Sequence, residues 1–279
     1  MQKILITGAN GLLGQKLVHL LANNPEIDLI ATARGKSRLS ISEGFSYEEM
    51  DLCNPAQIQE VIDKVRPDSI IHTAAMTNVD ICHQNPEGCW EANVTAVEYL
   101  IEQCLRHNIY LCHVSTDFVF DGENGPYQEE DQPAPISIYG KSKYEAELRV
   151  RASGLRWSII RTVLVYGIVP DMSRSNIILW VKSSLEKGQA IKVVSDQLRT
   201  PTLAEDLAIG CWLATQKQAQ GIYHISGKDF MSPYDMAIAT ADYFALDKTL
   251  ITEVTADTFT QEAKRPPRTG FILDKAIHE

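Results

Sequence analysis

The chain has 279 residues, of which 44% are hydrophobic and 22% are charged, and its formal net charge is -10 at pH 7. This composition is typical of a globular protein with a large core, and it excludes a disordered or fibrous chain. The acidic balance disfavours binding to nucleic acid or to an anionic membrane, so we expect a small-molecule partner. No segment is apolar enough to cross a bilayer and the first residues do not resemble a secretory leader, which favours a cytoplasmic protein.

Apolar runs alternate with amphipathic stretches in the first part of the chain. The pattern predicts strands at 3–7, 27–32, 69–72, 109–115 and 157–165, and helices at 11–22, 58–65, 91–106 and 137–152. Such alternation is typical of a doubly wound α/β fold, the Rossmann arrangement, in which a parallel sheet is covered by helices on both faces. We expect residues 1–170 to form this core and ligands to bind at the carboxyl ends of its strands.

The order becomes irregular in the second part of the chain. Helices are predicted at 177–186, 203–214 and 232–244, and strands at 190–194 and 221–225. We interpret residues 171–279 mainly as a smaller α/β lobe that binds substrate, with some segments returning to the core.

A glycine-rich turn follows the first predicted strand. Its sequence, GANGLLG, spans residues 8–14 and leads into the first predicted helix. Glycines at this place allow a tight turn and a close approach of the backbone to a pyrophosphate, which the helix N-terminus then binds. The candidate dinucleotide-binding residues are Gly8, Asn10, Gly11, Leu12 and Gly14. The alternative is a plain glycine turn, which the strand and helix on either side make less attractive.

The end of the second strand indicates which dinucleotide binds. An NAD-specific site would place an acidic residue there, whereas this chain has Arg34, with Lys36 and Arg38 nearby. Because a guanidinium can hold a 2′-phosphate through charge-assisted hydrogen bonds, we expect NADP(H), with NAD(H) as the alternative. A solvated basic loop would show the same residues.

Tyr139 and Lys143 lie four residues apart in a predicted helix. This spacing places both side chains on one face, where the ammonium can lower the pKa of the phenol and the phenol can act as a proton donor. Thr116 follows the preceding strand and can donate a hydrogen bond to a substrate carbonyl. The structural alternatives are an exposed amphipathic helix and a turn-capping threonine.

Five further segments occur in a characteristic order. They are HTAAMTNVD at 72–80, STDFVFDG at 115–122, RTVLVYG at 161–167, DQLRTPT at 196–202 and RPPRT at 265–269. With the motifs above, they resemble the extended short-chain dehydrogenase/reductases, and among these the dTDP-4-dehydrorhamnose reductase family. The likeness covers nearly the whole chain.

The resemblance implies roles for individual residues. Thr116, Tyr139 and Lys143 would form the catalytic triad, with Tyr139 and Lys143 also contacting the cofactor. Further cofactor contacts would come from Asp51, Leu52, Ala74, Ala75, Thr77 and Asn93. A sugar nucleotide would lie near Thr77, Phe118, Asn176, Arg199 and Arg265, the two arginines offsetting its diphosphate charge.

The resemblance predicts NADPH-dependent reduction of a keto group on a nucleotide-linked sugar, and it allows a homodimer. Phe118 and Leu164 depart from the family pattern, which has an aromatic hydroxyl and a tryptophan at these positions. Two alternatives therefore stay open: a non-catalytic NADP-binding regulatory subunit, and a reductase of a non-sugar ketone. The six cysteines have no zinc-ligand spacing, so we expect no metal site.

Overall fold

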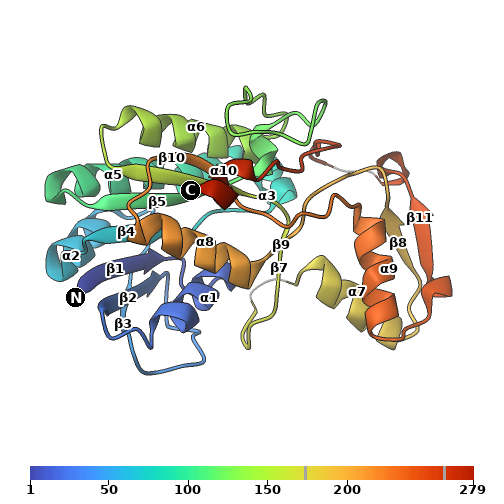
Figure 1. The fold of residues 1–279 in the computed structure, drawn as a ribbon, viewed down its shortest axis with the longest axis horizontal. Coiled ribbons are helices and arrows are strands. Elements are labelled where there is room, and N and C mark those ends of the chain that lie inside the picture. The colour runs from blue at the N-terminus through green and yellow to red at the C-terminus, as the bar shows by residue number, and fades with distance from the viewer. Residues whose placement is uncertain (173–174, 260–261) are drawn as a thin grey trace.

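A parallel sheet forms the centre of the computed structural model, which describes residues 1–172, 175–259 and 262–279 (Figure 1). In these ranges the sheet has seven strands in the order β10-β6-β5-β4-β1-β2-β3. The strands are β1 (Gln2–Thr7), β2 (Ile27–Ala33), β3 (Ser46–Glu49), β4 (Ser69–His72), β5 (Tyr110–Thr116), β6 (Trp157–Thr162) and β10 (Gly221–His224). The predicted doubly wound fold is confirmed, although β3 was not foreseen.

Helices cover both faces of this sheet. On one face, α1 (Leu12–Leu21) and α8 (Ala204–Gln216) pack on apolar strand residues such as Ile4 and Ile71. On the other face, α2 (Pro55–Val65), α5 (Ala96–His107) and α6 (Ile138–Ala152) bury Leu5, Ile70 and Leu111. Because alternate strand residues point to opposite faces, the nearly continuous apolar strands fill two cores at once.

The predicted helix 91–106 is more complicated in the structure. It is preceded by α3 (Val79–Gln84) and α4 (Pro86–Trp90), and a π-helical turn at Glu91–Thr95 joins α4 to α5. The side chains of Asn78 and Asn85 cap the two short helices. Asparagine caps and a proline at the first helical position are known start signals, so the sequence did contain evidence for both helices.

A smaller lobe lies beside the core, on the right in Figure 1. It consists of α7 (Ile177–Glu186), α9 (Pro233–Tyr243), β8 (Ile191–Val194) and β11 (Ile251–Val254), with an apolar core that includes Val181, Val193 and Ala237. The short pair β7 (Val165–Tyr166) and β9 (Thr202–Leu203) connects lobe and core. The remaining described helices are α10 (Asp274–His278) and three 3-10 turns at Asp117–Val119, Lys248–Leu250 and Ala256–Thr258.

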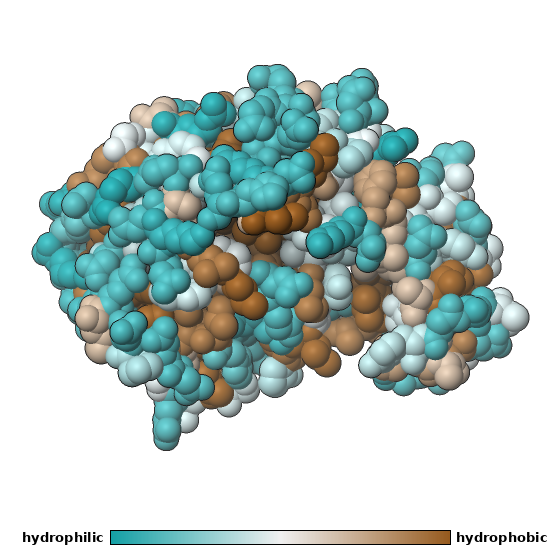
Figure 2. Space-filling view, in the orientation of Figure 1, coloured by the Kyte–Doolittle hydropathy of each residue, from teal (hydrophilic) through white to brown (hydrophobic). Residues whose placement is uncertain are grey.

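Two segments of the second half of the chain lie in the core. Strand β10 extends the main sheet beside β6, and α8 packs against α1. The strand predicted at 157–165 ends earlier, at Thr162, because Leu164 has a φ of 36° and interrupts the extended backbone. Apolar surface is visible over α1 and α8 in Figure 2. These two helices carry the exposed residues Leu20, Ile209 and Leu213.

Strand order determines where a ligand can bind. The chain crosses from β1 to β2 on one side and returns to β4 on the other, so β1 and β4 are neighbours at a topological switch point. In open α/β sheets the crevice outside the carboxyl ends of such strands is the usual ligand site. The glycine turn, the loop after β4 and the end of β5 therefore meet at one edge.

Candidate functional site

The glycine turn after β1 has no room for side chains at two positions. Gly8 has a φ of 70°, and a Cβ there would lie 2.8 Å from the backbone nitrogen of Ala74. A Cβ on Gly14 would lie 2.2 Å from the Gly8 carbonyl oxygen. Both glycines are thus required by close backbone packing, and this packing joins the turn to the loop after β4.

The start of α1 leaves backbone amides open. Gly11 is the N-cap and Leu12 the first helical residue, and no described side chain caps this terminus. Asn10, predicted to bind cofactor, organises the next loop: its Nδ2 donates to the Lys36 carbonyl at 2.9 Å, and its Oδ1 accepts from the Arg38 amide at 2.8 Å. The turn therefore combines a free helix N-terminus with a fixed loop after β2.

That second loop carries the basic residues. Arg34 and Lys36 are exposed, whereas the Arg38 guanidinium donates from Nε to the Asp171 carboxylate at 2.9 Å. Because the Arg34 side chain is exposed, an anion can reach its guanidinium. The Arg38 contact ties the loop to the segment that leads into the small lobe.

The residues after β3 and β4 line the neighbouring part of the edge. Asp51 accepts a hydrogen bond at Oδ1 from the Cys53 amide at 3.0 Å, and Leu52 packs against the core. Ala74 and Ala75 are half-buried, and Thr77 is exposed at the end of the same loop. These positions surround the switch point, as the cofactor assignment requires.

Asn93 holds the loop after β4 in place. Its Oδ1 accepts from the Met76 amide at 2.8 Å, and its Nδ2 donates to the Met76 carbonyl and to Ser142 Oγ, each at 3.0 Å. The side chain comes from the π-helical turn, a feature that often occurs at functional sites. Asn93 thus connects the loop to helix α6, where Tyr139 and Lys143 lie.

Tyr139 is buried in the first turn of α6, against Cys82 and Cys89, and its ring meets Phe118 edge to face at 5.7 Å. Burial raises the pKa of the phenol above its ordinary value, and a hydrogen bond with Thr116 opposes that rise. Desolvation therefore outweighs any lowering of this pKa by Lys143 in the cofactor-free protein.

Lys143 lies one helical turn further on and is also buried. Its Nζ donates to the Val114 carbonyl at 2.8 Å and contacts His113 Nε2 at 3.3 Å. Burial lowers the pKa of the ammonium to about 8, while the charge of Glu147 opposes the shift. The side chain is therefore mostly charged at neutral pH.

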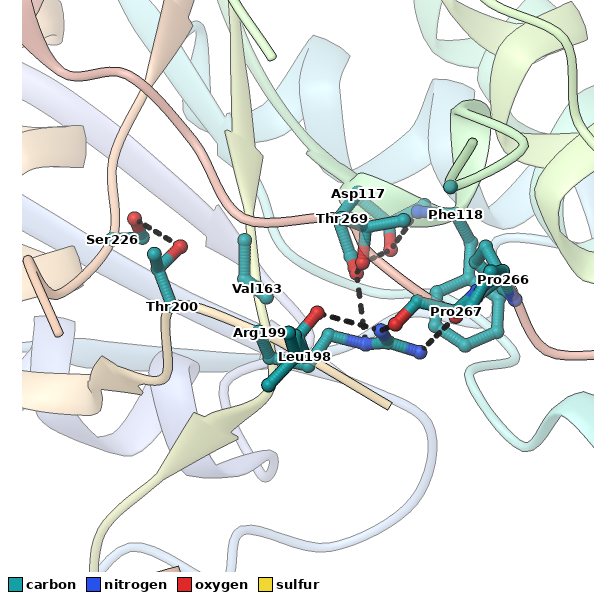
Figure 3. A network of polar contacts seen from close by, with 12 residues as sticks. Asp117, Phe118, Val163, Leu198, Arg199, Thr200, Ser226, Pro266, Pro267 and Thr269 are labelled. Carbon is teal, nitrogen blue, oxygen red and sulfur yellow. Dashed lines mark hydrogen bonds and ion pairs between the residues drawn. The ribbon is translucent and has the colours of Figure 1, made fainter. Parts of the chain in front are cut away.

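Thr116 ends β5 beside a polar network (Figure 3). Its hydroxyl donates to Asp117 Oδ1 at 3.0 Å, and Thr269 donates to the other carboxylate oxygen. Burial raises the pKa of Asp117, although Arg199 and the two threonines oppose this shift. Asp117 lies inside the STD segment but was given no role in the sequence analysis, although its place after β5 was a usable signal.

Arg199, predicted to contact the substrate diphosphate, lies at the centre of this network. Its guanidinium donates to the carbonyls of Leu198, Pro266 and Pro267 at 2.5 to 3.2 Å, and its Nε lies 3.5 Å from Asp117 Oδ2 (Figure 3). The side chain is buried and directed at protein atoms. In this structure Arg199 joins distant segments, and its contact with a diphosphate stays a prediction.

The other predicted substrate residues lie around the small lobe. Asn176 caps α7 by accepting from the Leu179 amide, and its Nδ2 donates to the Gly167 carbonyl at 2.6 Å. Arg265 donates to Asp80 at 2.6 Å. A cavity of about 650 Å³ lies beside this ion pair, and its lining comprises Asp80, Gln84, Trp180, Val194, Gln197, Phe259, Glu262 and Arg265.

The two positions that depart from the family pattern have different environments. Phe118 is half-buried between Tyr139 and the Arg199 guanidinium, which lies 5.8 Å from its ring centre. Leu164 is 39% exposed with a left-handed backbone, a conformation that is strained for leucine.

Two kinds of feature are absent from the described part of the chain. Among those residues, no three His, Cys, Asp or Glu side chains gather in a way that could hold a metal ion. Likewise, none of the helices traced there is both long and apolar enough to span a membrane.

Comparison with known proteins identifies the relatives of this chain. The family model described as RmlD substrate binding domain matches residues 1–278. A dTDP-4-dehydrorhamnose reductase of Aggregatibacter actinomycetemcomitans is 32% identical over 99% of this chain and 92% of its own length. The beta subunit of methionine adenosyltransferase 2 of Xenopus tropicalis is 32% identical over 91% of this chain and 75% of its own.

A solved structure gives the same result. A dTDP-4-dehydrorhamnose reductase of Bacillus anthracis, in complex with NADP, has a TM-score of 0.84 and 28% identity, covering 98% of this chain and 91% of that one. The family model, the sequence relatives and the structure agree with the fold and the motifs described above. The chain therefore belongs to the RmlD substrate binding domain family.

Proposed function

We propose that this protein is an NADPH-dependent reductase of a keto group on a nucleotide-linked sugar. The observation that carries the proposal is a continuous path of contacts between the catalytic helix and the glycine turn. Lys143 contacts His113, the His113 ring stacks on His72, and His72 Nδ1 lies 2.7 Å from Thr7 Oγ1. Thr7 directly precedes Gly8. The phenol and ammonium of α6 therefore share one edge of the sheet with the predicted cofactor site.

The shape of the turn fits a dinucleotide. A Cβ at Gly8 or Gly14 would clash with neighbouring protein atoms, so both glycines keep the turn tight, and the uncapped α1 terminus offers amides to the charge of a pyrophosphate. Arg34 is exposed at the end of β2, where a 2′-phosphate would lie. The relative of known structure was solved with NADP, which supports the same cofactor here.

The residues of α6 and β5 would handle the proton. NADPH, when bound, supplies a hydride to the ketone carbon. Burial keeps the Tyr139 phenol protonated at neutral pH, so it can give a proton to the ketone oxygen. The Lys143 ammonium stabilises the tyrosinate that remains, and the Thr116 hydroxyl polarises the carbonyl by turning from Asp117 to the substrate.

The cavity beside the small lobe suits a sugar nucleotide. Its volume of about 650 Å³ lies in the range of small-molecule sites, and Trp180 and Phe259 line it together with polar side chains. Aromatic rings can stack on a nucleobase, while Arg265 can turn from Asp80 to a diphosphate. Reductases of dTDP-linked sugars among the relatives support this substrate class.

A second function is favoured by one comparison. The methionine adenosyltransferase subunit has the same percentage identity as the reductase over a shorter match, and as a subunit of a larger enzyme it supports a role in a complex. The buried Tyr139 and Lys143 pair speaks for catalysis, because a purely structural helix gains nothing from a buried ammonium with a depressed pKa.

The experiment is NADPH consumption with keto-sugars linked to dTDP, UDP or GDP, beside simple non-sugar ketones. We expect turnover with a nucleotide-linked keto-sugar, abolished by Lys143→Met and retained by Lys141→Met, an exposed lysine of the same helix. Turnover of the simple ketones alone would overturn the substrate class. Binding of NADPH without any turnover, together with a stable partner protein in pull-downs, would favour the regulatory function.

A further inference from the structure

Two acceptors of strand β5 hold the Lys143 ammonium in place. An ammonium has three N–H donors and no acceptor, so the contacts with the Val114 carbonyl at 2.8 Å and with His113 Nε2 at 3.3 Å use two donors. Glu147, one turn further along α6, provides charge but no direct contact: its carboxylate accepts from Ser115 at 2.6 Å and from Arg161 at 2.7 and 2.9 Å. The orientation of Lys143 therefore depends on strand β5.

The contact determines the protonation state of His113. Since Lys143 can only donate, Nε2 must accept, and the ring proton lies on Nδ1. Burial, the charge of Lys143 and the nearby His72 hold the pKa of His113 well below its ordinary value, so the ring is neutral. A neutral imidazole of this tautomer is a fixed acceptor.

His113 has no other polar use in the described part of the chain. Its Nδ1 is buried there without a hydrogen-bond partner. The ring is held by packing instead: His113 and His72 are in register on neighbouring strands, and their rings stack at 5.2 Å with an angle of 26°. A buried polar atom without a partner destabilises the folded state, so an apolar side chain would stabilise the fold better at this position. The contact with Lys143 supplies a reason for the histidine.

We propose that His113 is a positioning residue for the reaction: its Nε2 aims the Lys143 ammonium so that the third N–H faces the cofactor and the tyrosinate. This inference rests on the proposed reductase function, because it gives the aimed ammonium its task. His72 supports the ring by stacking and is itself anchored to Thr7, at the entrance to the glycine turn.

The proposal predicts the sign of a pH effect. The groups that influence Lys143 are Glu147 on α6 and Cys89 on α4, which raise its pKa, and its own burial, which lowers it to about 8. Tyr139 lies on the same helix as Lys143, and His113 and His72 face Lys143 from the sheet. An acceptor stabilises the charged form of lysine, so removal of His113 Nε2 should lower the pKa of Lys143 towards neutral pH.

The test compares three substitutions. His113→Asn is too short to reach Lys143, whereas His113→Gln places an amide oxygen near the position of Nε2. His72→Phe is the matched control, because it changes the stacked partner in the same layer without removing an acceptor from Lys143. Two quantities are measured in the full-length protein: the titration of the Lys143 side chain by carbon NMR of its Cε, and the pH profile of kcat and of KM for NADPH.

We expect His113→Asn to move the Lys143 titration to lower pH and to reduce kcat at alkaline pH about tenfold, with less effect at acidic pH. His113→Gln should restore both towards the wild type, and His72→Phe should leave the titration unchanged. An unchanged Lys143 titration in His113→Asn would overturn the proposal whatever the activity. A shifted titration in a protein without reductase activity would support the contact and instead refute the proposed reaction.

Discussion

Two buried cations show how differently this fold uses charge. Lys143 is 2% exposed and Arg199 is 4% exposed. The lysine contacts one carbonyl and one neutral imidazole, and its pKa is lowered to about 8. The arginine donates to three backbone carbonyls and forms an ion pair with the Asp117 carboxylate.

The difference separates a reactive position from a structural one. A fully engaged guanidinium cannot reach a new partner without leaving buried groups unpaired, so Arg199 stabilises the junction between the core and the segments near 198 and 266. A lysine with one donor left and a depressed pKa can respond to a ligand. Burial alone therefore does not distinguish a reactive cation from a structural one, whereas the number of its hydrogen-bond and ion-pair partners does.

The largest expected effect concerns the reactive side of this comparison. Tyr139→Phe removes the proton donor while keeping the ring that packs on Phe118. We expect turnover to fall about a thousandfold, with little change in NADPH affinity or in thermal stability. Steady-state kinetics and NADPH titration measure this, and Tyr144→Phe, a half-buried tyrosine of the same helix, is the control. Retained turnover would mean that Tyr139 is not the acid.

For Arg199, the structural cation of the two, we predict a loss of stability instead. Arg199→Met leaves the buried Asp117 carboxylate without its cation, which should reduce the free energy of unfolding by about 3–5 kcal/mol. The double variant Arg199→Met with Asp117→Asn should recover part of this loss, because the uncompensated charge is gone. Urea unfolding followed by circular dichroism provides the measurement. If the single variant unfolds like the wild type, Arg199 is free to serve a substrate as first predicted.

The same comparison shows what could be predicted from the sequence. The apolar periodicity of the strands and helices is a property of neighbouring residues, so the doubly wound fold was predicted correctly. The spacing of Tyr139 and Lys143 is also visible in neighbouring residues. The contacts of Arg199 could not be predicted, because its acceptors Pro266 and Pro267 are 67 and 68 residues away along the chain and only tertiary packing brings them together. The bonds of Asn93 to Met76 could not be predicted either, because they depend on a π-helical turn that no periodicity indicated.

A smaller effect concerns the exposed cation at the cofactor loop. Arg34→Ser should weaken NADPH binding about tenfold and leave NADH binding almost unchanged, because an exposed charge contributes less than a buried one. Lys16→Ser on the distant face of α1, where the lysine pairs with Glu205, is a matched loss of positive charge. Fluorescence titration measures the affinity of each variant for NADPH and for NADH. Equal losses for NADPH and NADH would show that Arg34 does not contact the 2′-phosphate.

The effect that is smallest at neutral pH is the pH dependence of stability contributed by one buried histidine near each of the two cations compared above. Burial lowers the pKa of His72, near the reactive lysine, and of His224, near the Arg161 ion pair, to about 3 from an ordinary value of 6.5. Both rings stay neutral in the folded protein but take up protons when it unfolds, so stability is complete above about pH 6.5 and falls as the pH drops towards 3.

Each of these histidines should contribute a slope of about 1.4 kcal/mol per pH unit within that window. His224→Gln should therefore flatten the pH dependence of the free energy of unfolding by about one proton, while His19→Gln, an exposed histidine of α1, should not change it. Urea unfolding at a series of pH values tests this. If His224→Gln leaves the slope unchanged, the His224 ring is already protonated in the folded state, beside Arg161. The structure argues against this, because Nε2 has no acceptor for a second ring proton among the described residues.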